Sequence, residues 1–293
     1  MKTVIIGANS FIAQSLYPYL RKDESNSIVM ATKSDADAMN LSQLKYFLKR
    51  FKPDAVINCA VKGGRRTHAD NWKDFKDNII MVENLLQLRD FYNQLILFSS
   101  GAAFDRRYPI YLAKEFPQID ECTIPIDPYG RSKWFNDQTA RGYDGVTNLR
   151  LFNCFDSRGM KDSFLYTCVK KCQANEDVRI WENIYFDTIS ARNLSLVVDF
   201  FLKNPSHGYR EINCVHTKKY RLSDLARIIS DMTFSRSKIF IEKYGENHYC
   251  GDGTLLSSLP VKLRPMEGEL RSFCEHVTYE EELKTENYGI FIS

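Results

Sequence analysis

The hydrophobic positions in the first half of the chain form two alternating kinds of segment. Helical spacing occupies Phe11–Arg21, Leu41–Phe51, Trp72–Tyr92 and a stretch from Pro128 onward. Between these segments lie short apolar runs without period-2 alternation, as in strands buried on both faces: Thr3–Ile6, Ser27–Thr32, Asp54–Asn58, Leu95–Phe98 and Asn148–Phe152. The alternation predicts an α/β fold with a doubly wound parallel sheet that binds its ligand at the carboxyl ends of the strands.

The pattern becomes less regular after about residue 155. Helices are predicted near residues 163–174, 193–201 and 222–232, and strands near 178–181 and 211–214. At 293 residues the chain exceeds a typical domain of about 100–150 residues. We therefore predict a nucleotide-binding sheet domain over residues 1–155. A smaller C-terminal substrate-binding lobe is expected over residues 156–293, with some segments returning to the sheet.

The turn after the first strand has the character of a dinucleotide-binding turn. Gly7 directly follows the strand, where a glycine permits a sharp turn and lets backbone N–H groups face a pyrophosphate. Ser10 and Ala13 stand where a strict fingerprint has glycine, so the match is degraded. The same turn also occurs in α/β proteins that bind no nucleotide, and by itself it leaves both interpretations open.

A second motif, Tyr129-Gly-Arg-Ser-Lys133, lies at the start of the helix that Pro128 opens. Its tyrosine and lysine are one helical turn apart and share a face. A nearby ammonium favours the phenolate, so we expect Lys133 to lower the pKa of Tyr129 and allow proton exchange with a carbonyl or alcohol. The second match, Tyr166 to Lys170, lies within a predicted lobe helix and is interpreted as structural.

Composition restricts the classes of partner. The 40 Lys and Arg nearly balance the 37 Asp and Glu, which argues against a dedicated nucleic-acid surface. No stretch approaches the roughly 20 apolar residues that span a bilayer, so no membrane partner is expected. The eight cysteines form no C-x-x-C pair and the five histidines lack metal-ligand spacing. These features predict a cytoplasmic protein with reduced thiols and no metal site.

Together these motifs resemble the extended short-chain dehydrogenases/reductases that act on nucleotide sugars, the NAD-dependent epimerase/dehydratase family. Further matches in the same order are Asn40-Leu41, Asn58-Cys-Ala60, Asn78 and Leu149-Arg-Leu-Phe-Asn153. The segment from Asn58 to Gly64 is particularly similar to that of GDP-fucose synthases and their relatives. The resemblance covers nearly the whole chain. It implies a Rossmann NAD(P)-binding domain, a nucleotide-sugar substrate and a homodimer.

The resemblance also assigns roles to individual residues. Tyr129 would be the catalytic acid, Lys133 would bind the nicotinamide ribose, and Ser100, with Ser99 as the fallback, would bind the reacting oxygen. The cofactor-binding set it implies is Gly7, Asn9, Ser10, Phe11, Ile12, Thr32, Lys33, Ser34, Asn40, Leu41, Cys59, Ala60, Val61, Asn78, Phe98, Ser99, Tyr129, Lys133, Leu151 and Phe152. The substrate-binding set is Lys62, Ser100, Gly101, Ala102, Asn153 and Arg192.

Departures from the family pattern narrow the reaction. Family dehydratases carry an Asp-Glu pair directly after the catalytic Ser or Thr, where this chain has Gly101 and Ala102. The cysteine of bifunctional epimerase-reductases also falls on Ala102, and Cys59 and Cys154 are interpreted as packed residues. What remains is reduction of a keto group, expected at C4, of a nucleotide-linked deoxysugar in surface-polysaccharide synthesis. The alternatives are an NAD-dependent 4-epimerase and a non-catalytic nucleotide sensor with the same fold.

The end of the second strand bears on the choice of cofactor. Enzymes that use NAD place an acidic residue there for the ribose hydroxyls, whereas a 2′-phosphate is bound by cationic and hydroxyl groups. The chain reads Thr32-Lys33-Ser34, which favours NADP. Asp35 or Asp37 could reach back if the strand ends later, so NAD stays open.

Overall fold

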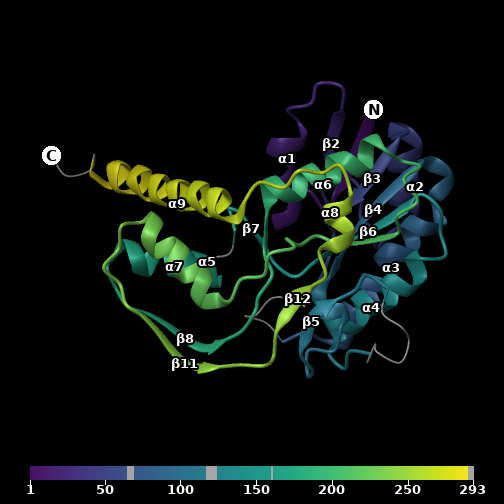
Figure 1. The fold of residues 1–293 in the computed structure, drawn as a ribbon. Coiled ribbons are helices and arrows are strands. Elements are labelled where there is room, and N and C mark those ends of the chain that lie inside the picture. The colour runs from purple at the N-terminus through teal and green to yellow at the C-terminus, as the bar shows by residue number, and fades with distance from the viewer. Residues whose placement is uncertain (65–68, 117–123, 160, 290–293) are drawn as a thin grey trace.

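A six-stranded, wholly parallel sheet forms the centre of the protein in the computed structural model, which describes residues 1–64, 69–116, 124–159 and 161–289, with side chains up to residue 277 (Figure 1). The strand order is β10-β6-β4-β3-β1-β2. The strands are β1 (Lys2–Ile6), β2 (Ser27–Ala31), β3 (Ala55–Asn58), β4 (Gln94–Ser100), β6 (Val146–Leu151) and β10 (Glu211–Asn213). The predicted parallel α/β fold is confirmed.

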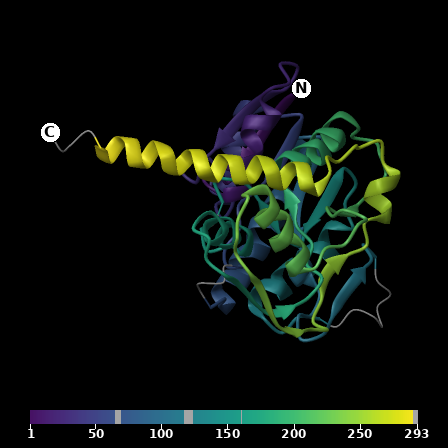
Figure 2. The same cartoon turned by 60° about the vertical axis from the view of Figure 1, so that its left-hand side comes forward.

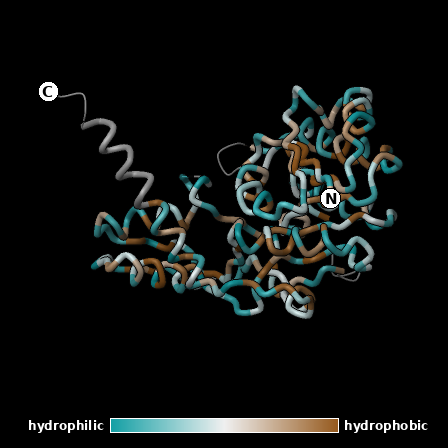
Figure 3. The backbone as a smooth tube through the Cα atoms, turned by 90° about the horizontal axis from the view of Figure 1, so that it is seen from above, coloured by the Kyte–Doolittle hydropathy of each residue, from teal (hydrophilic) through white to brown (hydrophobic). Residues whose placement is uncertain are grey.

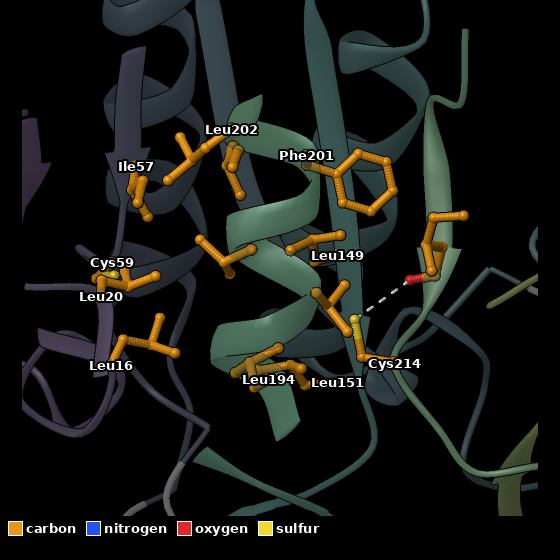
Figure 4. Packing of buried hydrophobic residues seen from close by; sticks show 14 of the residues in the cluster. Leu16, Leu20, Ile57, Cys59, Leu149, Leu151, Leu194, Phe201, Leu202 and Cys214 are labelled. Atoms are coloured by element: carbon orange, nitrogen blue, oxygen red, sulfur yellow. Dashed lines mark hydrogen bonds between the residues drawn. The ribbon is translucent and has the colours of Figure 1, made fainter. Parts of the chain in front are cut away.

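Helices cover both faces of this sheet. On one face α1 (Phe11–Leu20) packs beside α6 (Ala191–Lys203), with α8 (Thr254–Ser258) near β10. The other face carries α2 (Leu41–Phe51), α3 (Trp72–Gln87) and α4 (Pro128–Ala140). Phe201 and Leu202 of α6 pack with Leu149 of β6 and Ile57 of β3, all almost fully buried (Figure 4). Burial of apolar side chains on both faces explains why the strands read as continuous hydrophobic runs.

Segments beyond residue 155 return to the sheet. Strand β10 pairs with β6 at the edge of the sheet. Helix α6 covers one face (Figure 1). Hydrophobic stretches run through the interior of this unit, whereas its outer loops are mainly polar (Figure 3).

A smaller lobe has its own apolar cluster. It contains α5 (Phe164–Gln173), α7 (Leu222–Met232) and the start of α9 (Met266–Gly289), packed over β8 (Val178–Asn183) and β11 (Ile239–Tyr244). The strands β8 and β11 form a parallel pair to one side of the central sheet (Figure 1). The far end of α9 projects away from the rest of the molecule (Figure 2). Within the described ranges, no helix has the length and apolar character needed to cross a membrane.

Two further strand pairs join the lobe to the sheet unit. Strand β5 (Ile110–Ala113) pairs with β12 (Tyr249–Gly251), and β7 (Cys154–Phe155) pairs with β9 (Ile189–Ser190). Each pair connects a segment that follows a central strand with a segment of the second half. Residues from both halves of the sequence therefore meet beyond the carboxyl ends of β4 and β6.

Candidate active site

A cavity of about 540 Å³ lies at the carboxyl edge of the sheet, between it and the lobe. Its size is in the range of small-molecule sites. The cavity is lined by most of the residues predicted for the catalytic centre and by many of those predicted to bind the cofactor or the substrate. They are Phe11, Ile12, Cys59, Ala60, Val61, Asn78, Phe98, Ser99, Ser100, Ala102, Tyr129, Lys133, Leu151, Phe152 and Asn153.

The turn at Gly7 lies in close contact with the backbone of the segment that follows β3. Strands β2 and β3 lie on opposite sides of β1, so the strand order reverses there, at the point where open α/β sheets bind ligands. Gly7 has a φ of 79°, and a Cβ there would lie 2.6 Å from the Ala60 nitrogen. Ser10 caps α1, accepting a hydrogen bond from the Ala13 N–H at 3.3 Å. The helix start and the crevice fit a dinucleotide pyrophosphate.

Hydroxyl, cationic and acidic groups all gather at the end of β2. The Thr32 and Ser34 hydroxyl oxygens are 2.7 Å apart, and the side chain of Lys33 is 79% exposed. The Asp35 carboxylate accepts hydrogen bonds from the Thr32 N–H at 2.9 Å and the Thr32 hydroxyl at 2.6 Å. These hydrogen bonds to Thr32 hold the pKa of Asp35 below its usual range. The groups that suit a 2′-phosphate are present, and so is the carboxylate that sequence analysis left open.

The start of α4 places Tyr129 and Lys133 in the cavity. Asp127 caps the helix by accepting the Gly130 N–H at 2.7 Å, and Pro128 occupies the first turn. Lys133 Nζ donates to the Phe98 carbonyl at 2.7 Å and lies 5.7 Å from the centre of the Tyr129 ring. The backbone of Gly64 passes over that ring, because a Cβ there would lie 2.6 Å from Tyr129 Cζ. Gly64 therefore covers one side of the Tyr129 ring, and the Phe98 carbonyl anchors Lys133.

The electrostatics of this pair differ from the expectation that Lys133 lowers the pKa of Tyr129. Burial raises the pKa of Tyr129, and the neighbouring Tyr249 raises it further. Burial also lowers the pKa of Lys133 to about 8, although Asp137 opposes this change. Desolvation dominates both shifts because both groups are buried away from water. Tyr129 is consequently a protonated phenol at neutral pH, the form that donates a proton.

Ser100 ends β4 and faces the same cavity. Its hydroxyl oxygen accepts the Ala102 N–H at 3.1 Å and interacts with the Tyr129 phenol, which opposes the rise in that pKa. Ser99, which also lines the cavity, donates its hydroxyl proton to Asp137 at 2.8 Å instead. The geometry therefore favours Ser100 over Ser99 as the hydroxyl beside Tyr129.

A buried ionic network lies beneath the site and was missed by sequence analysis. Asp137, one turn after Lys133 on α4, accepts hydrogen bonds from Ser99 and from Arg150 at 2.9 Å. Arg150 also donates to Glu211 of β10 at 3.0 Å. All three charged side chains are at most 3% exposed. The network joins α4, β4, β6 and β10 under the cavity floor and so fixes where Tyr129 and Lys133 stand.

Several residues of the predicted sets lie outside the cavity wall. Asn9 is exposed, and Asn40 uses its side chain to cap α2, which begins at Leu41. Lys62 pairs with Asp77. Arg192 lies over the Tyr19 ring, with its Cζ 5.6 Å from the ring centre.

Asn78 and Gly101 have packing roles in addition to their predicted ones. The Asn78 side chain accepts the Lys62 N–H at 2.8 Å and donates to the Lys62 carbonyl and to Ser132 of α4. Asn78 thereby holds the loop after β3 against α4. Gly101 is fully enclosed, because a Cβ there would lie 2.5 Å from Phe152 and 2.8 Å from Tyr249.

Further residues, from the segment after β4 and from the second half of the chain, complete the wall and were not found from sequence. Most come from short or irregular segments without periodicity, whereas Phe164 and Leu222 begin the predicted helices α5 and α7, and no signal singled any of them out as a site residue. Arg106 bonds Asp127 at 3.0 Å, and His248 contacts the rings of Tyr111 and Tyr185. The lining residues in this group are Arg106, Tyr108, Ile110, Phe164, Ile184, Phe186, Leu222, Asn247, His248 and Tyr249. This mixture of aromatic, apolar and polar groups suits an amphipathic small molecule.

The cavity cysteines are poor candidates for proton abstraction. Cys59 and Cys154 both line the wall, and burial raises the pKa of each thiol. A thiolate, which would be the reactive form, is therefore disfavoured. In the part of the chain that the structure describes, no group of three or more His, Cys, Asp or Glu residues is arranged to hold a metal ion.

A profile of the NAD dependent epimerase/dehydratase family matches residues 3–214, well over half of the chain. The chain belongs to this family. The match includes the Gly7 turn, Ser100, Tyr129 and Lys133. No curated protein sequence matches significantly.

Solved structures share the fold at low sequence identity. GDP-mannoheptose C4 reductase from Campylobacter jejuni, solved with NADP bound, has a TM-score of 0.79 and 16% identity, covering 94% of this chain and 98% of its own. GDP-L-fucose synthetase from Naegleria fowleri, bound to NADP, has a TM-score of 0.73 and 16% identity, covering 96% and 94%. dTDP-4-dehydrorhamnose reductase from Clostridium acetobutylicum has a TM-score of 0.78 and 18% identity, covering 95% and 100%.

Proposed function

We propose that this protein uses NADPH to reduce a keto group, at C4, of a nucleotide-linked deoxysugar for surface-polysaccharide synthesis. The observation that carries the proposal is the convergence of Ser100, Tyr129 and Lys133 on one cavity, next to positions 101 and 102 that hold no acid or base. Membership of a family of NAD-dependent enzymes supports it. The similar structures named above include nucleotide-sugar reductases solved with NADP.

The residues of the cavity suit this chemistry. Bound NADPH would supply a hydride to the carbonyl carbon of the sugar. The protonated phenol of Tyr129 donates its proton to the oxygen that becomes the alcohol, and Ser100 holds that oxygen by a hydrogen bond. Lys133 holds the ribose of the cofactor beside Tyr129. The balance is one hydride and one proton added across the carbonyl bond, leaving a secondary alcohol and NADP⁺.

Elimination of water, and epimerisation at a carbon adjacent to the carbonyl, each need a further base beside the carbonyl. Gly101 and Ala102 supply no such side chain, and burial disfavours the thiolates of Cys59 and Cys154. A 4-epimerase that oxidises and re-reduces one carbon needs only Ser100, Tyr129 and Lys133. It remains the rival function, and net cofactor consumption distinguishes it from the proposed reductase. As the family resemblance implies, we propose that the protein works as a cytoplasmic homodimer.

The proposed acid can be tested with a matched pair of variants. Tyr129→Phe removes one hydroxyl from the cavity, whereas Tyr166→Phe removes one from the other Tyr-x-x-x-Lys sequence in α5. We expect Tyr129→Phe to lower kcat by about 100-fold or more while NADPH binding persists. Tyr166→Phe should reduce the sugar at the wild-type rate. Unchanged turnover in Tyr129→Phe would contradict the assignment.

A further inference from the structure

Tyr249 begins β12 and brings a second phenol to the reacting centre. Its backbone pairs with Ile110 of β5, which fixes the strand beside the cavity. Its ring packs edge-to-face on Phe152, with centroids 5.1 Å apart, and stacks on Phe186 at 6.0 Å. The ring is thus held on two sides by aromatic neighbours, which leaves little rotational freedom.

The hydroxyl end of this ring lies against the residue that follows Ser100. A Cβ on Gly101 would lie 2.8 Å from Tyr249 Cζ, the carbon that bears the phenol oxygen. Any side chain at position 101 would therefore push the phenol away from Ser100. Gly101, which supplies no base to this site, thus also leaves the space that the Tyr249 ring occupies.

Ser100 is shared by the two phenols. Its oxygen accepts the Ala102 N–H at 3.1 Å, and its side chain interacts with both Tyr129 and Tyr249. A hydroxyl offers one proton and two lone pairs. Since Ala102 takes one lone pair, one further donor can bind the other lone pair, and the hydroxyl proton is left for one acceptor.

Burial, more than the neighbouring charges, leaves both phenols protonated. Arg106 and Asp127 form an ion pair at 3.0 Å beside Tyr249, and Tyr129 faces Arg106 and Asp70. Burial raises the pKa of each phenol above its usual value. Both rings are therefore neutral phenols at neutral pH, and each has a proton to donate.

On the basis of the proposed function, we propose that Tyr249 is a positioning residue for the reduction. Its phenol donates to the free lone pair of Ser100 Oγ, so that the Ser100 proton points to the reacting oxygen. Tyr129 keeps its own proton for transfer to the same oxygen. Without Tyr249, the Tyr129 phenol is free to donate to Ser100 instead, and the acid is turned away from the sugar.

Kinetics of Tyr249→Phe test this role, because phenylalanine keeps the ring on Phe152 and Phe186 and removes only the hydroxyl. We expect kcat to fall about 10-fold or more, with KM for the sugar and NADPH affinity within about two-fold of wild type. In a Ser100→Ala background the same change should cost nothing further. Tyr111→Phe, on the neighbouring strand and 49% exposed, is the matched control and should behave as wild type.

Three kinetic results would overturn the proposal. The first is an unchanged kcat in Tyr249→Phe. The second is a raised KM at constant kcat, which would make Tyr249 a substrate contact. The third is an equal loss with and without Ser100, which would mean that Tyr249 acts independently of it.

A measurement without substrate separates this inference from the proposed reaction. In protein labelled with [¹³Cζ]tyrosine at neutral pH, the signal lost in Tyr129→Phe identifies Tyr129. We expect this signal to move in Tyr249→Phe, to stay in place in Tyr111→Phe, and to become insensitive to Tyr249→Phe once Ser100 is alanine. A Tyr129 signal that Tyr249→Phe leaves in place would overturn the coupling even if the protein reduces the sugar.

Discussion

Replacing Gly7 with alanine tests the cofactor turn most sharply. Gly7 has a φ of 79°, in the left-handed region that favours glycine. An added Cβ would lie 2.6 Å from the Ala60 nitrogen, 2.8 Å from Ala60 Cα and 2.9 Å from the Cys59 carbonyl carbon. All three are backbone atoms, which cannot rotate away as a side chain would. The turn and the segment after β3 must therefore move apart.

The magnitude has two parts. The positive φ costs a residue with a Cβ about 1–2 kcal/mol. Relieving the backbone contacts adds about 1–3 kcal/mol, as overpacking does elsewhere. We expect Gly7→Ala to lower the free energy of unfolding in urea by about 2–5 kcal/mol. NADPH affinity should fall about 10-fold or more, because the crevice at the helix start widens.

Substitutions at two other glycines distinguish the cost of the positive φ from the cost of the backbone contacts. Gly208 has a φ of 77° with no atom within 4 Å of an added Cβ, so Gly208→Ala isolates the backbone cost. Gly268 lies in α9 with open space around it, and Gly268→Ala should be neutral or stabilising by up to about 1 kcal/mol. If Gly7→Ala is no less stable than Gly208→Ala and binds NADPH as wild type does, the close approach to Ala60 has no role in the site.

Three further predictions concern charged groups. Lys33→Ala should raise KM for NADPH about 10-fold and leave KM for NADH unchanged in parallel assays, and equal changes would refute a role at the 2′-phosphate. The pKa of Lys133 is about 8 in the folded protein against 10.5 as the reference, so the unfolded chain binds more protons between these values. The free energy of unfolding of the wild-type protein in urea should therefore increase, relative to that of Lys133→Met, as pH rises from 8 to 10.5. Parallel pH profiles of the two proteins would contradict this. Asp137→Asn removes the carboxylate shared by Ser99 and Arg150 and should cost about 3 kcal/mol in urea unfolding, whereas a loss under 1 kcal/mol would show that the network is not stabilising.

The first half of the sequence predicts its own structure well because its signals are local. The expected strand Ser27–Thr32 is β2 (Ser27–Ala31), and the expected helix Leu41–Phe51 is α2 with the same bounds. The start of α4 at Pro128 was also visible, since proline is favoured at the first position of a helix. The long helix expected to Tyr92 ends earlier, at Gln87, and a short 3₁₀ turn at Arg89–Phe91 follows.

The missing parts of the site depend on contacts between distant segments. Tyr249 lies in a three-residue strand, too short for periodicity, and reaches Ser100 only because β12 pairs with β5. Arg106 has no motif around it. The expected effect of Lys133 on the pKa of Tyr129 failed because spacing gives proximity but not burial, and burial dominates here. Helix α9 was missed, although Met266, Leu270 and Phe273 begin an apolar stripe that packs into the lobe, because the rest of its sequence is mainly polar.

The central claim is net reduction of a nucleotide-linked sugar, and loss of NADPH absorbance tests it directly. The purified protein is mixed with a panel of nucleotide-linked 4-keto-6-deoxysugars, with NADH in parallel and Tyr129→Phe as the inactive control. We predict stoichiometric consumption of NADPH with one of these sugars and formation of the corresponding alcohol. A sugar whose stereochemistry changes without consumption of either cofactor would contradict the account and establish an epimerase.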